Sequence, residues 1–230
     1  MNEGEVPSPQ PTPRIQLTER DHMILLWIGE QYVINLRQLR VLLARGKENN
    51  LPPVSESAAY VWITRMKTLG VIEVVTPFRG WGPFLWLTST GLRFVGLEFK
   101  AMKPAVTTLK HLYWCGQARL FLAQRRPLDT WQSERYLRFE QVRAGKKLDD
   151  VRELPDGHLV TEKGLIAIEV ELVPKEVARV VGIMTKRVEA YGTTWYFCSQ
   201  ESHSVATKAH ERLMPGAAEH IKIYDLSVLE

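Results

Sequence analysis

The segment GLIAIEVELV, residues 164–173, constrains the fold of this chain more than any other stretch. Side chains alternate across a β-strand, so one face of the segment is fully apolar and consists of Ile166, Ile168, Val170 and Leu172. The other face carries Glu169 and Glu171, whose carboxylates would lie about 6–7 Å apart and repel each other. The apolar face predicts a buried strand, and the two glutamates predict that a positive group lies between them.

The segments around this strand predict a mixed sheet flanked by helices over residues 104–230. Further strands are expected in VRELPDGHLVT, which the turn EKG follows, and in TTWYFCSQ and HIKIYDLSVL. Helices are expected in TLKHLYWCGQARLFLAQRR, in TWQSERYLRFEQVRAG with Ser133 near its start, in PKEVARVVGIMTKRVEAYG beginning at Pro174, and in SVATKAHERL. This order of elements predicts an α/β domain.

Residues 17–103 begin with three helical patterns. The first, LTERDHMILLWIGEQ, has Thr18 as its expected N-cap and Asp21 as the acid of a capping box. The second, NLRQLRVLLARG, has Asn35 as its cap and Gly46 as its stop. The third, SESAAYVWITRMKTLG, ends at a glycine suited to the left-handed conformation that often follows a helix.

After Gly70 the apolar period changes from helical to two. VIEVVTP and PFLWLT predict a hairpin with the tip FRGWG, and TSTGLRFVGLEF predicts a closing helix. Three helices, a hairpin and a closing helix are the parts of a winged helix-turn-helix domain. The alternative is an unrelated small helical domain with a hairpin. The proline-rich residues 1–16 predict a disordered leader.

In a winged helix the third helix enters the major groove of double-stranded DNA. The outward residues of this helix that we expect to contact DNA are Tyr60, Thr64, Arg65 and Lys67. The alternative is a solvated helix face without a ligand. The formal net charge of +4 suits a nucleic-acid partner without requiring one.

The hairpin tip brings Phe78, Arg79 and Trp81 together in a turn framed by glycine and proline. Large aromatic side chains are normally kept out of such turns, so they need a partner. Two explanations remain open. Either Arg79 and Trp81 contact DNA, or the tip packs on the second domain.

The two cysteines, Cys115 and Cys198, lie in the apolar contexts YWCGQ and WYFCSQ. They predict buried thiols in a reducing compartment and neither a disulfide framework nor a cysteine-based zinc site. The sequence has no apolar run of ~18 residues, which a membrane helix needs, and no signal pattern at its start. We therefore expect a cytoplasmic protein without membrane association.

Asp156 adds a third carboxylate to the two glutamates. In LPDG it is expected to end the strand before EKG, and a hairpin through EKG would bring it beside Glu169. Carboxylate oxygens are the ligands that Mg²⁺ and Mn²⁺ prefer, so Asp156, Glu169 and Glu171 predict a metal site suited to phosphodiester hydrolysis. The alternative is a set of solvated acids beside an ordinary PDG turn. The nearby His158 is expected to be incidental.

The PD of residues 155–156 and the EVE of residues 169–171 resemble the motif of the PD-(D/E)XK nuclease superfamily. That motif usually ends in a lysine, where this chain has Glu171. The resemblance implies that the acids bind the metal and act in catalysis, and that Lys175 either supplies the displaced positive charge or is a plain surface lysine. It also implies an acid on the first helix, for which Glu134 in WQSERYL is the candidate.

The order of short motifs along the chain resembles the replication-relaxation family of mobile-element proteins. LTERD and LTSTG bracket the first domain, and LKHL, WQSE, PDG, IEVEL and RVEAYG follow in order. The resemblance covers nearly everything after residue 16. It implies a DNA-binding protein of plasmids, phages or integrative elements, with a second copy of the chain or replication and relaxosome proteins as further partners.

These observations predict a winged helix over residues 17–103 that locates DNA, and a restriction-endonuclease-like domain over residues 104–230 that cuts or nicks it with Mg²⁺ or Mn²⁺. The alternative is a non-catalytic transcriptional regulator or relaxosome accessory protein, in which the nuclease-like fold serves for dimerisation or partner binding. The missing lysine favours that alternative. A third hypothesis is a repressor that acts through the winged domain alone.

Overall fold

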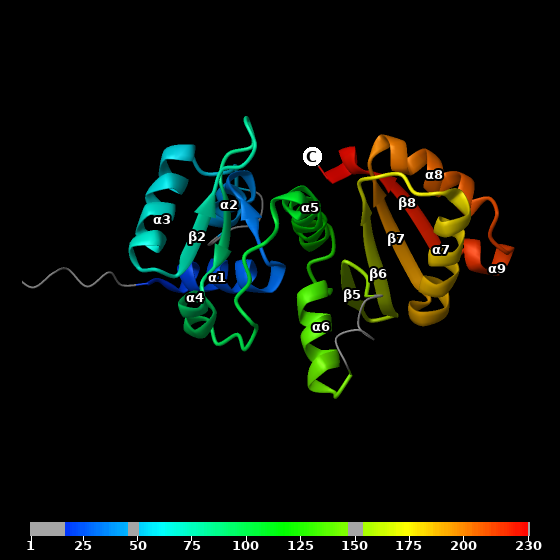
Figure 1. The fold of residues 1–230 in the computed structure, drawn as a ribbon, viewed down its shortest axis with the longest axis horizontal. Helices are drawn as coiled ribbons and strands as arrows, with labels where there is room; N and C mark the ends of the chain where they lie inside the picture. The colour runs from blue at the N-terminus through cyan, green and yellow to red at the C-terminus, as the bar shows by residue number, and fades with distance from the viewer. Residues whose placement is uncertain (1–16, 46–50, 147–153, 230) are drawn as a thin grey trace, which may run out of the picture.

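The structure is a computed structural model that describes residues 17–45, 51–146 and 154–229. A small antiparallel sheet with its helices lies at one end of the molecule, a five-stranded mixed sheet lies at the other, and helices α5 and α6 lie between them (Figure 1). This α+β arrangement confirms the expected division into helices with a small sheet, followed by a mixed sheet flanked by helices. The predicted leader, residues 1–16, and the predicted helix stop at Gly46 lie outside the described residues.

The described residues of the first part of the chain form four helices around a three-stranded antiparallel sheet in the order β1-β3-β2. Its elements are α1 (Glu19–Gln31), β1 (Ile34–Asn35), α2 (Leu36–Ala44), α3 (Glu56–Thr68), β2 (Ile72–Val75), β3 (Phe84–Leu87) and α4 (Ser89–Phe94). Strands β2 and β3 are the two predicted arms of the hairpin. Strand β1 was not predicted, because two residues are too few to show alternation.

The predicted helix caps of this part are confirmed. Thr18 and Asp21 bond reciprocally in a capping box at the start of α1. Asn35 forms a second capping box with Gln38 at the start of α2. Gly70 follows α3 with a φ of +67°, in the left-handed region that glycine tolerates best. These local interactions place the ends of α1, α2 and α3 before any long-range packing is considered.

In the second part, residues 104–146 and 154–229 contribute five strands in the order β4-β5-β6-β7-β8. Its elements are α5 (Leu109–Arg125), β4 (Thr130–Ser133), α6 (Glu134–Arg143), β5 (Gly157–Thr161), β6 (Gly164–Glu171), α7 (Val177–Tyr191), β7 (Thr193–Cys198), α8 (Gln200–His210), α9 (Pro215–Ala218) and β8 (Ile221–Asp225). Pairing is antiparallel from β4 to β6 and parallel from β6 to β8. Strand β6 is therefore where the two modes of pairing meet.

The two faces of β6 pack on different layers. Ile168 and Val170 lie in one apolar cluster with Leu122 of α5, which covers the inner face of the sheet. Helices α7 and α8 cover the outer face, where Met184 and Ala206 pack in a second cluster (Figure 1). The apolar face predicted for β6 is thus a buried core face, and the glutamates point toward the α7 side.

Three details of the second part correct the sequence-based expectations. Residues 130–133, predicted as the start of a helix, form β4 because they pair with β5, and the helix starts only after its N-cap Ser133. Helix α7 starts at Val177 and not at Pro174. Asp156 directly precedes β5 and does not end it. The short helix α9 was not predicted.

Polar contacts join the two parts. The guanidinium of Arg135 donates to the carbonyl oxygens of Gly29 at 2.7 Å and Lys100 at 2.8 Å. The hydroxyl of Ser133 donates to the carbonyl of Glu30 at 2.6 Å. These bonds tie the start of α6 to the end of α1. Over the described ranges, none of the helices is both long and apolar enough to cross a bilayer.

Candidate functional site

Helix α3 lies at the end of the molecule away from the five-stranded sheet (Figure 1). Its inner face enters the core through Ile63 and Met66. The predicted DNA-contacting residues Thr64 and Lys67 are exposed, and Tyr60 is 46% exposed. These three side chains therefore lie together on an accessible helix face, as a groove-binding helix requires.

Arg65, the fourth residue predicted to contact DNA from α3, lies in a different environment. Its Nη2 atom lies 2.5 Å from the carboxylate of Asp21, and its side chain is 31% exposed. The same carboxylate accepts a hydrogen bond from Trp62 Nε1 at 2.8 Å. The sequence placed Arg65 on the outward face, whereas the structure shows its guanidinium holding α3 against α1.

The hairpin tip packs on the second part of the chain. The ring of Trp81 contacts Tyr113 of α5 edge-on, with 5.2 Å between ring centroids. The Nζ atom of Lys110 lies 5.1 Å from the ring centroid of Phe78 and 5.5 Å from that of Trp81. Of the two open explanations, packing on the second domain is the one that the structure bears out for the aromatic rings. Arg79 remains exposed at the tip.

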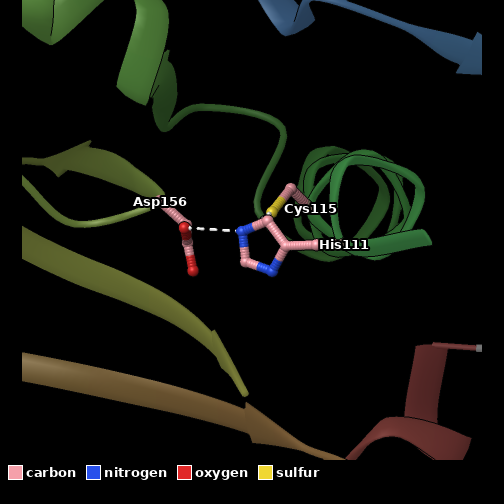
Figure 2. A group of neighbouring side chains, drawn as sticks. All are labelled: His111, Cys115 and Asp156. Atoms are coloured by element: carbon pink, nitrogen blue, oxygen red, sulfur yellow. Dashed lines mark hydrogen bonds and ion pairs between the residues drawn. The ribbon is translucent and has the colours of Figure 1, made fainter. Parts of the chain in front are cut away.

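Asp156 lies beside His111 and Cys115 of helix α5 (Figure 2). Its Oδ2 accepts a hydrogen bond from the backbone N–H of Val170 at 2.7 Å, and its Oδ1 lies 2.9 Å from Nε2 of His111. The Sγ atom of Cys115, one helical turn from His111, lies 3.4 Å from the same nitrogen. The Asp156 carboxylate therefore replaces a backbone carbonyl as the acceptor for the N–H of Val170, at the point where β5 and β6 stop pairing.

Charges in this trio influence one another. Cys115 and the Asp156 carboxylate raise the pKa of His111 above its usual value, against the opposing effect of burial. Burial raises the pKa of the Cys115 thiol to about 11. Of the two groups beside the imidazole, Asp156 is the nearer, with Oδ1 2.9 Å from Nε2 against 3.4 Å for Cys115 Sγ.

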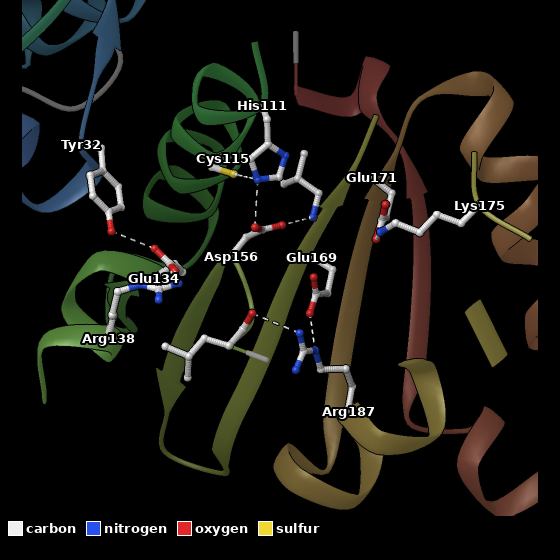
Figure 3. A network of polar contacts seen from close by, with 12 residues as sticks. Tyr32, His111, Cys115, Glu134, Arg138, Asp156, Glu169, Glu171, Lys175 and Arg187 are labelled. Carbon is white, nitrogen blue, oxygen red and sulfur yellow. Dashed lines mark hydrogen bonds and ion pairs between the residues drawn. The ribbon is translucent and has the colours of Figure 1, made fainter. Parts of the chain in front are cut away.

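Glu169 is buried beside Arg187 of α7, whose Nε donates to its carboxylate (Figure 3). Arg187 also donates to the carbonyl of Leu154 at 3.1 Å. Burial, followed by the charge of Asp156, raises the pKa of Glu169 to about 8, whereas the nearby carboxylate raises the pKa of Arg187. Arg187 favours the charged form of Glu169, but burial disfavours that form more strongly, so the pKa of Glu169 is raised. The carboxylate in turn favours the protonated form of Arg187, so the pKa of Arg187 is raised as well.

Glu171 forms an ion pair with Lys175, which lies in the connection before α7 (Figure 3). The positive group predicted beside the two glutamates is thus two groups, one for each carboxylate. Both pairs line an open cavity of about 450 Å³ on the α7 side of the sheet, whose other lining residues include Arg179 and Lys186. Cations outnumber carboxylates on this wall, which suits a phosphate more than an isolated divalent ion.

Glu134 lies on the other side of the sheet, at the start of α6. Its Oε2 accepts a hydrogen bond from the Tyr32 hydroxyl at 3.0 Å, and its Oε1 accepts one from Nε of Arg138 at 2.8 Å. Together with Asp156 it lines a second cavity, of about 640 Å³, between α1, α5 and α6. Glu134 is therefore held by residues of both parts of the chain.

The five residues predicted to act in catalysis are divided between two cavities. Glu169, Glu171 and Lys175 line the one beside α7, whereas Asp156 and Glu134 line the one beside α5. Within the described part of the chain, the three-residue group with potential ligand atoms all within 4.8 Å of one another is His111, Cys115 and Asp156. It is not the predicted trio of Asp156, Glu169 and Glu171.

His111 and Cys115 were missed by the sequence reasoning. Their i, i+4 spacing on a predicted helix was the available signal, but only the fold brings Asp156 to them. His158, expected to be incidental, is a buried ring 4.7 Å from the ring centroid of Tyr191. Burial, with help from Arg187, lowers its pKa to about 4 and keeps it neutral.

Comparison with known proteins identified no relative of this chain. Neither the models of known protein families, nor the curated proteins, nor the solved structures contain a match to this chain.

Proposed function

We propose that this chain is a DNA-binding protein in which the first part is a winged helix-turn-helix and α3 enters the major groove of a DNA duplex. The observation that carries this proposal is the exposed polar face of α3, which holds Tyr60, Thr64 and Lys67 opposite a buried apolar face. Hydroxyl groups suit phosphate contacts, and a lysine suits either a phosphate or a guanine edge.

The resemblances noted in the sequence add a biological context to this proposal. They favour a protein of a plasmid, phage or integrative element, with the five-stranded part as a nuclease-like domain. In the structure each of the three acids predicted to bind a metal already lies beside a basic side chain: Asp156 beside His111, Glu169 beside Arg187 and Glu171 beside Lys175. This pairing supports a role in dimerisation or partner binding for residues 104–230, as in a regulator or a relaxosome accessory protein.

A charge-removal pair tests the DNA-binding role. Lys67→Ala should weaken binding to duplex DNA and lower the dependence of log K on log salt concentration by about 0.9, since one phosphate contact disappears. Lys163→Ala is the matched control, because it removes the same charge from an exposed turn of the other sheet. Fluorescence anisotropy over a salt series measures both. Equal losses in the two variants, or no binding by the unmodified protein, would contradict the proposal.

Metal-dependent cleavage of phosphodiester bonds is a second candidate. Glu169 and Glu171 favour it because they line one cavity with Lys175 and Arg187, which could bind phosphate. A Mg²⁺ or Mn²⁺ ion held by these glutamates would have to displace the two cations from them. A plasmid-nicking assay with either metal, comparing the unmodified protein with Glu169→Gln, distinguishes the candidates. Metal-dependent nicking that the variant loses supports an enzyme, and intact plasmid with both proteins supports the non-catalytic role.

A further inference from the structure

We infer that His111, Cys115 and Asp156 bind a single transition-metal ion, for which Zn²⁺ is the best match. The site lies on the wall of the 640 Å³ cavity between α5 and the loop that leads into β5 (Figure 2). It is distinct from the magnesium or manganese site predicted from the sequence, with which it shares only Asp156. It is also independent of DNA binding by α3.

The helix supplies two of the three ligands. His111 and Cys115 are four residues apart on α5, so their side chains project from one face of the helix on successive turns. The third ligand, Asp156, approaches from the residue that directly precedes β5. Its Oδ1 lies 2.9 Å from His111 Nε2, from which Cys115 Sγ lies 3.4 Å. All three donor atoms lie within 4.8 Å of one another.

These separations are close to those that zinc requires. Zn–N and Zn–O bonds of about 2.1 Å and a Zn–S bond of about 2.3 Å, at tetrahedral angles, place N and O about 3.4 Å apart and N and S about 3.6 Å apart. The observed N–O separation of 2.9 Å is therefore short by about half an ångström. A small rotation of His111, whose side chain is 37% exposed, supplies that space.

The neighbouring residues hold two of the ligands in position. The N–H of Val170 fixes Oδ2 of Asp156 at 2.7 Å and leaves Oδ1 directed at the site. Cys115 is buried in the apolar cluster that α5 shares with the sheet. Such outer contacts orient metal ligands and account for part of a site's affinity.

The donor set identifies the ion. An imidazole nitrogen, a thiolate and one carboxylate suit Zn²⁺ or Co²⁺ and disfavour Mg²⁺ and Ca²⁺, which take oxygen ligands. Three protein ligands leave a fourth position, and this one opens on the cavity, where Glu134 and Ser133 also lie. Structural zinc sites usually have four protein ligands, whereas three with one open position are typical of sites that bind an exchangeable molecule.

Metal titration of the full-length protein tests this inference. After removal of metal by a chelator, the unmodified protein should bind one equivalent of Zn²⁺ in competition with a chromophoric chelator. His111→Gln should weaken that binding at least tenfold. Because His111 is partly exposed, this variant is expected to keep its fold, and circular dichroism checks that it does.

Cobalt spectroscopy identifies the thiolate ligand. Co²⁺ bound to the unmodified protein should show a near-ultraviolet band from thiolate-to-metal charge transfer. Cys115→Ala should lose this band, whereas Cys198→Ala, the matched control at the other buried cysteine, should retain it.

Three results would overturn the site: no stoichiometric binding of Zn²⁺ by the unmodified protein, equal affinity in His111→Gln, or a charge-transfer band that survives in Cys115→Ala. Should Cys115→Ala fail to fold, the His111→Gln titration still decides. None of these outcomes affects the Lys67→Ala test of DNA binding, so the two proposals can fail separately.

Discussion

At the scale of single residues, the carboxylate of Asp21 is an ionisable group buried in the first part of the molecule. It is fully buried, yet it accepts hydrogen bonds from the backbone N–H and hydroxyl of Thr18 and from Trp62, and it faces Arg65. Burial works to raise its pKa, but the hydrogen bonds from Thr18 and Trp62 and the charge of Arg65 outweigh it. The pKa of Asp21 therefore lies below its usual value.

Replacing this carboxylate should destabilise the fold. Asp21→Ala is expected to cost about 3 kcal/mol at neutral pH, since it leaves Arg65 and three hydrogen-bond donors without their acceptor. Asp21→Asn should cost less because it keeps one acceptor oxygen. Urea unfolding measures both values, and a cost below about 0.5 kcal/mol for Asp21→Ala would contradict this account of the site.

The same carboxylate predicts a dependence on pH. The folded-state pKa of Asp21 is depressed, so its contribution to stability is present above the unfolded value of 3.8 and is lost as pH falls through the folded-state value. The stability difference between the unmodified protein and Asp21→Asn should therefore shrink below about pH 4. A difference that stays constant from pH 6 to pH 2 would show that the charge of Asp21 is not what stabilises the folded state.

Local patterns predicted some of these residues and not others. Thr18 and Asp21 were found because a capping box depends on a spacing of three residues, and the antiparallel pairing of β5 with β6 followed from the turn EKG between them. The contact of Asp156 with His111 could not be predicted. It depends on how α5 lies across the sheet, which no local spacing determines.

At the scale of elements, the edge strand β4 depends on a close approach between Trp131 and Gly157. A Cβ atom added to Gly157 would lie 2.6 Å from Cη2 of the Trp131 ring. That ring donates a hydrogen bond from Nε1 to the side chain of Gln31 at 3.1 Å, which links β4 to α1. Glycine at this position thus allows the tryptophan to cross the β4–β5 pair.

Gly157→Ala should therefore destabilise the protein by about 1–3 kcal/mol, since the ring must move and lose its bond to Gln31. Gly182→Ala is the matched control: it lies within α7 and a Cβ there meets nothing within 4 Å, so up to about 1 kcal/mol of stabilisation is expected. Chemical denaturation measures both. Similar effects of the two substitutions would rule out the steric explanation.

The same strand shows why prediction of elements was incomplete. TWQS continues without a break into the helical pattern of α6, and only its pairing with β5 makes it a strand. Strands β5 to β8 were found because alternation or apolar runs mark them. Strands β1 and β4 show no such pattern, because they are short and pair with strands that are distant in the sequence.

At the scale of the whole molecule, Arg135 joins the two parts. Besides its bonds to the carbonyls of Gly29 and Lys100, its guanidinium lies 4.7 Å from the ring centroid of Tyr32 and 4.9 Å from that of Phe99. We expect the unmodified protein to unfold in one cooperative transition, because this junction couples the two cores.

Arg135→Ala should separate that transition into two, with a loss of about 2–4 kcal/mol, since the carbonyls of Gly29 and Lys100 lose their donor and two rings lose a cation. Arg135→Lys should recover little of this stability, because an ammonium cannot donate to both carbonyls in the geometry of a guanidinium. Differential scanning calorimetry distinguishes one transition from two. A single transition at an unchanged temperature in Arg135→Ala would show that other contacts join the parts.

The packing of the hairpin tip on α5 affects the entropy cost that binding of a DNA duplex would have. Because Trp81 and Phe78 already pack against Tyr113 and Lys110, the tip of the β2–β3 hairpin would not have to become ordered if DNA bound as proposed. Association would then cost little conformational entropy. Calorimetry of the complex should therefore show a small change in heat capacity, as expected for rigid-body association. Folding of the hairpin tip upon binding would instead give a large change in heat capacity.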